Sequence, residues 1–190
     1  TLWHTLSLHD ALPICHGPVY DDPEFILEAY RDWVSPKMKN EVVLPYISMH
    51  GSTERMVKHL IDALAREGVK VHAFDLAVTD IGKLAITLVA AATLIVGTPT
   101  VHVGPHPAVY YAAHLANLLR PKLKYAAIVG SYGWSSKAIE QISGLIPNLK
   151  VEVLGTVLQK GAPTDKTYAE LDSLAAAVAK AHKESELVAT

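Results

Sequence analysis

Apolar residues in this chain fall into short unbroken runs that alternate with longer stretches of helical spacing. The unbroken runs are expected to be buried strands, at residues 41–47, 70–75, 92–98, 125–131 and 151–158. The stretches that follow place apolar residues three or four positions apart, which predicts helices at residues 53–67, 80–89, 107–119, 136–145 and 165–182. From residue 41 onward, strand and helix therefore alternate throughout.

This alternation with short connections indicates a parallel sheet, because each helix carries the chain back to the edge where the next strand begins. We predict an α/β fold for residues 41–184: a flavodoxin-like, doubly wound, five-stranded parallel sheet in the order 2-1-3-4-5, with helices on both faces. Residues 185–190 are expected to be a short tail.

A further helix is predicted ahead of this domain. Residues 22–34 carry apolar and aromatic side chains at helical spacing, with Asp22 as candidate N-cap and Pro23 in the first helical position. The polar, proline-containing residues 35–40 then indicate a linker.

Composition narrows the class of protein. The 190 residues carry a formal charge of −2 without a Lys/Arg-rich stripe, so neither nucleic acid nor a membrane is expected as a partner. The longest apolar stretch, residues 84–97, is too short to span a bilayer. The single cysteine, Cys15, excludes an internal disulfide, and with the lack of a signal-peptide pattern it predicts a cytoplasmic location.

The first fourteen residues are set apart from the fold. Residues 5–14, TLSLHDALPI, resemble over all ten positions one translated reading frame of a common sequencing adapter. We therefore interpret residues 1–14 as a sequencing artefact, with the genuine coding sequence beginning at Cys15 or His16. A real amphipathic leader is the alternative interpretation.

Ligands of open α/β sheets bind outside the carboxyl ends of the strands, near the point where the strand order reverses. The loop after the first strand combines three hydroxyls with a glycine and opens onto a helix N-terminus, where backbone N–H groups favour an anion. Its residues are Ser48, Met49, His50, Gly51, Ser52 and Thr53. We interpret this loop as a phosphate site; a simple helix-capping turn is the alternative.

Two further loops lie at the same predicted edge of the sheet. The loop after the third strand is rich in proline and glycine, so it is stiff and lets a flat ring approach the backbone; its candidate residues are Pro99, Thr100, Val101, His102 and Gly104. The loop after the fourth strand has two aromatic side chains; its candidates are Ser131, Tyr132, Gly133 and Trp134. The three loops predict a site for a phosphate joined to a flat heterocycle, unless the aromatics are core residues.

Together these loops resemble those of a known family. Residues 48–53 are similar to the flavodoxin phosphate loop T/S-x-T-G-x-T, with His50 in place of the usual hydroxyl. Residues 98–107 and 130–135 resemble the two isoalloxazine-facing loops of the flavodoxin domain in flavodiiron proteins, or A-type flavoproteins. The resemblance implies FMN as the cofactor, bound by the candidate residues of the three loops. We expect His50 to contribute its backbone and not its ring.

The region before the linker extends the resemblance. Residues 16–20 and 22–33 resemble the end of the metallo-β-lactamase-like domain that precedes the flavodoxin domain in flavodiiron proteins. In that family a histidine at the place of His16 is a ligand of a di-iron centre. The other ligands are absent from this sequence, so the resemblance implies that residues 15–40 are a domain remnant and linker with an incomplete metal site.

The function implied by the resemblance is electron transfer. The chain would be the FMN-binding domain of a flavodiiron oxygen or nitric oxide reductase, supplied by a rubredoxin-like or ferredoxin-like donor. The di-iron centre and a homodimer would belong to the full-length parent, and this chain would be an electron carrier without catalytic residues. Two alternatives stay open: a stand-alone flavodoxin or FMN-dependent quinone reductase, and a non-redox regulatory module of the same fold.

Overall fold

The structure, a computed structural model, describes residues 22–187. The chain divides after Pro36 into two units, Thr1–Pro36 and Lys37–Thr190. The described part of the first unit contains helix α2 (Pro23–Val34), whose N-cap Asp22 accepts a hydrogen bond from the backbone N–H of Phe25 at 3.3 Å. The predicted helix and its cap are thus confirmed. Residues 1–14 and His16 lie outside the described residues.

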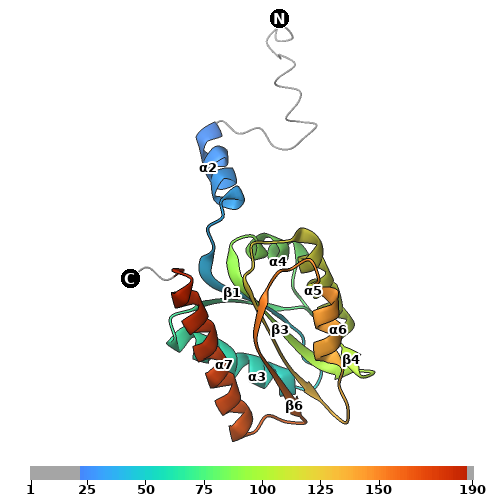
Figure 1. The fold of residues 1–190 in the computed structure, drawn as a ribbon. Coiled ribbons are helices and arrows are strands. Elements are labelled where there is room, and N and C mark those ends of the chain that lie inside the picture. Colours follow the sequence, from blue (N-terminus) through green and yellow to red (C-terminus); the bar gives the residue numbers. More distant parts are fainter. Residues whose placement is uncertain (1–21, 188–190) are drawn as a thin grey trace, which may run out of the picture. The chain divides into compact units, whose positions relative to one another are not determined.

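The second unit alternates strands and helices, as predicted (Figure 1). Its strands are β1 (Lys39–Tyr46), β2 (Lys70–Asp75), β3 (Ala91–Val101), β4 (Gly104–Pro105), β5 (Tyr125–Tyr132) and β6 (Glu152–Lys160). Its helices are α3 (Ser52–Arg66), α4 (Ile81–Leu88), α5 (Pro107–Leu119), α6 (Ala138–Leu145) and α7 (Asp165–Glu184). Among the described residues, no helix is both long and apolar enough to cross a membrane.

The sheet has the predicted topology. Its parallel strands follow the order β2-β1-β3-β5-β6, which is the order 2-1-3-4-5 when the parallel strands alone are counted. The sheet order reverses between β1 and β3, so the loops after these two strands lie side by side at the carboxyl edge.

Each face of the sheet has its own apolar core because successive residues of a strand point to opposite sides. On one face, Val42 and Leu44 of β1 pack in a cluster with residues of α3 and α7; on the other, Val43 packs with residues of α4, α5 and α6. Figure 1 shows the same two helical layers. Both faces are therefore covered, which explains the unbroken apolar runs of the sequence.

The end of the third strand differs from the prediction. β3 continues to Val101 instead of ending at residue 98, and the chain then reverses so that β4 pairs antiparallel with it, Val101 opposite Gly104. β3 is extended because it pairs first with β5, as far as Pro99 opposite Ser131, and then with β4. The strand end predicted at residue 98 was therefore wrong, and the loop expected after it contains a β-hairpin.

Candidate functional site

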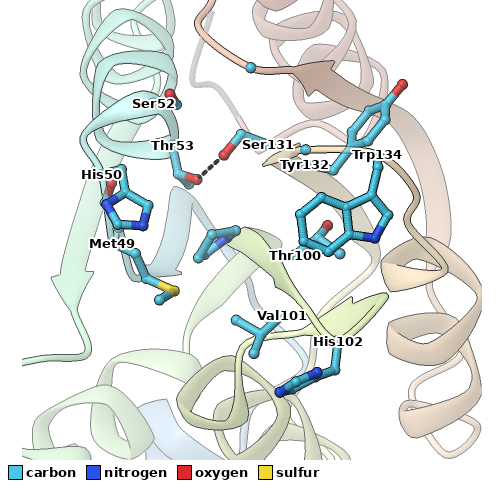
Figure 2. A pocket seen from close by; sticks show the side chains of 14 residues that line it. Met49, His50, Ser52, Thr53, Thr100, Val101, His102, Ser131, Tyr132 and Trp134 are labelled. Carbon is cyan, nitrogen blue, oxygen red and sulfur yellow. Dashed lines mark hydrogen bonds between the residues drawn. The ribbon is translucent and has the colours of Figure 1, made fainter.

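A pocket of about 450 Å³ opens at the carboxyl edge of the sheet (Figure 2). This volume lies within the range of small-molecule and cofactor sites. The residues that line it come from four segments at this edge: Ser48, Met49, His50, Ser52, Thr53, Pro99, Thr100, Val101, His102, Ser131, Tyr132, Gly133, Trp134 and Gly161. The three loops singled out in the sequence thus converge on one cavity.

The first wall of the pocket is the turn between β1 and α3. Gly51 is the N-cap of α3 and has a φ of 79°, a conformation that suits glycine, with open space where a Cβ would lie. The hydroxyl oxygen of Ser48 accepts hydrogen bonds from the N–H groups of Gly51 at 3.1 Å and Glu54 at 3.2 Å. The Ser48 side chain therefore fastens the turn to the first turn of the helix.

Backbone donors of this turn are left for a ligand. Within residues 22–187, the N–H groups of Ser52 and Thr53 have no hydrogen-bond acceptor, as the position of these residues in the first turn of α3 explains. The Thr53 hydroxyl is buried and lies 3.0 Å from the Ser131 hydroxyl, which ties the turn to the end of β5 (Figure 2). Adjacent unpaired N–H groups at a helix N-terminus form an anion site.

The second wall is the β3–β4 hairpin. Its two turn residues, His102 and Val103, both have positive φ, at 46° and 71°, as a type I′ turn requires. The Thr100 hydroxyl lies 2.8 Å from that of Ser136, and the N–H of Lys137 donates to the Val103 carbonyl at 2.6 Å. The loop before α6 therefore holds the hairpin in place.

The third wall is the loop after β5. Tyr132 is half-buried, whereas the Trp134 side chain is 84% exposed and stands at the mouth of the pocket opposite Met49 (Figure 2). Trp134 is therefore not a core residue. A flat ligand that covers both aromatic side chains would be stabilised, because it removes a large aromatic surface from water.

Three glycines distinguish the residues that line the pocket from the candidate cofactor-binding residues. Gly161 was missed, although it directly follows the carboxyl end of β6, where ligand-binding residues are expected. Its N–H donates to the Tyr132 carbonyl at 2.8 Å. Gly51 and Gly104 are not among the residues that line the pocket. Gly104 instead packs against the Gln141 side chain.

The pocket wall has no permanent charge. None of the described residues that line it is Lys, Arg, Asp or Glu. At the end of β1, burial and the carboxylates of Asp75 and Glu54 raise the pKa of the Tyr46 hydroxyl, which keeps that group neutral. Within the described residues, no three His, Cys, Asp or Glu side chains gather as a metal site would need. The arrangement suits an anionic group bound by N–H and O–H donors.

Comparison with known proteins agrees with this geometry. Residues 44–176 match the family described as Flavodoxin. The nitric oxide reductase of Moorella thermoacetica is 32% identical over 140 residues, 73% of this chain and 35% of that protein. The solved structure of rubredoxin oxygen:oxidoreductase from Desulfovibrio gigas has a TM-score of 0.81 at 27% identity, over 87% of this chain and 41% of that one. A flavodoxin from the domain Archaea shares the fold, with a TM-score of 0.64 at 24% identity over 75% of this chain and 99% of that one.

The doubly wound sheet and the pocket at its switch point define a flavodoxin-like domain, and the chain belongs to the flavodoxin family. It is a flavodoxin-like FMN-binding domain, homologous to the corresponding domains of flavodiiron proteins. The chain spans less than half the length of the nitric oxide reductase and the rubredoxin oxygen:oxidoreductase that it matches.

Proposed function

We propose that the pocket binds FMN with its phosphate against residues 48–53 and its isoalloxazine ring between the β3–β4 hairpin and residues 131–134. This proposal rests on the N–H groups of Ser52 and Thr53, which have no acceptor in the described part of the chain and lie at one end of a cavity that has aromatic side chains at the other. Phosphate oxygens accept hydrogen bonds from such N–H groups without a neighbouring cation.

The chain's own side chains then have distinct roles. Ser48, whose oxygen already accepts two N–H groups, keeps its hydroxyl proton to donate to the phosphate. Tyr132 and Trp134 cover the ring, while Met49, 53% exposed, lies at the other side of the opening. Bound FMN would supply the redox chemistry, and the protein would supply orientation and the electrostatic environment.

The test is a titration of the chain with FMN and with riboflavin, followed by flavin fluorescence. We expect micromolar or tighter binding of FMN. Gly51→Asp puts a carboxylate beside the phosphate and should weaken FMN binding about tenfold or more, because like charges repel. Gly51→Asn is the matched control: Asn has the same size and tolerates the same positive φ, so affinity should stay within about threefold.

Riboflavin, which lacks the phosphate, should bind both variants equally well. Wild-type chain that binds no FMN would refute the proposed function. Equal FMN affinity in the Asp and Asn variants would mean that the phosphate lies elsewhere in the pocket.

We further infer that the parent of this chain is a flavodiiron oxygen or nitric oxide reductase. Support comes from the relatives named above, one called a nitric oxide reductase and another a rubredoxin oxygen:oxidoreductase, each more than twice as long as the matched region. In this proposal electrons pass from a rubredoxin-like or ferredoxin-like donor to FMN and on to a di-iron centre in another domain of a homodimeric parent. His16 would be a remaining ligand of that centre.

The two rival functions agree less well with the relatives and with the sequence. A stand-alone flavodoxin or quinone reductase would use the same pocket, but relatives that extend far beyond the matched region favour the flavodiiron parent. A receiver-type regulatory module would need an aspartate at the end of β1, where this chain has Ser48. Reduced rubredoxin should bleach the visible absorbance of the FMN-loaded chain; failure with every small iron–sulfur donor would count against the flavodiiron parent.

A further inference from the structure

His50 places a titratable ring at the phosphate end of the pocket. The flavodoxin-type loop has a hydroxyl at this position, and the sequence led us to expect only a backbone contribution. In the structure His50 is exposed and among the residues that line the cavity, and Figure 2 shows its ring beside Met49, across the opening from His102 and Trp134. The ring is therefore within the site and available to a ligand.

The donors that remain at this end of the pocket are uncharged. Ser48 accepts from the N–H groups of Gly51 and Glu54, and those of Ser52 and Thr53 are among the N–H groups left without an acceptor within the described residues. The hydroxyl of Thr53 is already paired with Ser131. A phosphate monoester carries between one and two negative charges near neutral pH, and N–H and O–H donors bind its oxygens without cancelling that charge.

The two basic residues at the start of α3 both bind groups that do not line the pocket, so His50 is the candidate for positive charge at this end of the cavity. On α3, Lys58 is bound to Glu54 at 2.6 Å, and the Arg55 Nε donates to the Gly51 carbonyl at 3.4 Å without lining the pocket. At the end of β1, burial and the carboxylates of Asp75 and Glu54 act on Tyr46 and raise the pKa of its hydroxyl. Within the cavity wall, the other described titratable side chains are His102, on the hairpin, and Tyr132, on β5.

We propose that His50 is the specificity-determining residue for the phosphate: its protonated ring donates to the phosphate, so the chain prefers FMN over riboflavin more strongly as the pH falls. This inference rests on the proposed function. Imidazole is the side chain that ordinarily changes charge between pH 5 and 8, and a charge-assisted hydrogen bond is about twice as strong as a neutral one. Among the described residues that line the pocket, no Lys or Arg masks this change.

The experiment measures dissociation constants for FMN and riboflavin from pH 6 to pH 8. Their ratio isolates the phosphate, because both flavins share the isoalloxazine ring and the same folded protein, so effects of pH on these cancel. The wild-type preference for FMN should fall about tenfold over this range. In His50→Gln the ratio should stay level or rise slightly with pH, because the phosphate itself gains charge. His50→Lys should keep a strong preference at pH 8, since its charge persists.

His114→Gln, which removes an exposed imidazole on α5 away from the pocket, should behave as wild type. A wild-type ratio that is constant with pH, or a pH dependence removed by His102→Gln and kept by His50→Gln, would overturn the role of His50 while leaving FMN binding intact. If neither flavin binds at any pH, both the inference and the proposed function are wrong.

Discussion

The first and second walls of the pocket both contain residues with positive φ, but the two turns accommodate this conformation differently. In the β1–α3 turn, the positive φ of 79° falls on Gly51, where no atom would crowd a Cβ. In the β3–β4 hairpin, it falls on His102 and Val103, and a β-branched residue there is strained by about 1–2 kcal/mol. One turn is relaxed by its own sequence, and the other is not.

Contacts from a distant segment hold the strained turn. The Lys137 N–H donates to the Val103 carbonyl, the Thr100 and Ser136 hydroxyls pair, and Gly104 packs against Gln141. These partners precede or belong to α6 and lie more than thirty residues along the chain. The comparison teaches that one wall of the site is set locally, whereas the other depends on tertiary packing.

The largest expected effect is a loss of folding stability when β3, which carries the hairpin, can no longer pair closely with β5. Gly130 lies opposite Thr98, and a Cβ there would come within 2.1 Å of the Thr98 carbonyl oxygen, which is backbone and cannot rotate away. Gly130→Ala should therefore destabilise the fold by about 3 kcal/mol, measured by urea unfolding. Gly133→Ala is the control, since open space surrounds that position. Equal unfolding midpoints for the two variants would contradict the packing argument.

Low pH should also reduce the stability of the fold, through a buried histidine at the edge of the sheet opposite the pocket. This effect must be separated from the effect of pH on ligand binding. His182 is fully buried, 2.6 Å from the Thr93 hydroxyl and 2.7 Å from the Asn40 amide oxygen, and burial lowers its pKa to about 4. The unfolded chain, with the ordinary histidine pKa near 6.5, takes up the proton first. Stability should therefore be full above pH 6.5 and fall by up to about 3 kcal/mol as the pH drops to 4.

Urea unfolding at several pH values measures this slope. His182→Gln retains an amide that can bond to Asn40 and Thr93 but does not titrate, so its unfolding free energy should depend much less on pH in the same window. A slope that persists in the variant would assign the acid sensitivity to other groups. Because this effect concerns folding, it leaves the FMN-to-riboflavin ratio unchanged.

The sequence predicted what periodicity and short connections determine. Residues 41–47 and 92–98 read as buried strands because both faces are covered, and the order of the parallel strands followed from the alternation with helices. The residues of the β1–α3 turn were found because glycine and hydroxyls mark such a turn locally. Their convergence with residues 131–134 followed from the switch-point rule.

The hairpin escaped because its cause is not local. A two-residue turn is ordinarily signalled by Asn-Gly or a similar pair, and His102-Val103 carries no such signal. Its geometry comes from Lys137, Ser136 and Gln141, which no pattern within the hairpin itself reveals. Gly161 was missed for a related reason: it enters the site through the pairing of β6 with β5.

The smallest expected effects test the comparison most directly, because matched substitutions in the two turns should have opposite signs. Gly51→Ala forces a Cβ into the left-handed region and should destabilise by about 1 kcal/mol. Val103→Gly removes the strain of a β-branched residue at 71° and should stabilise by about 0.5 kcal/mol, since the added entropy of the unfolded glycine offsets part of the gain. Urea unfolding of both variants measures the two changes. If Val103→Gly destabilises instead, the contacts from the α6 side fit the Val103 backbone so well that no strain remains, and the two walls are alike.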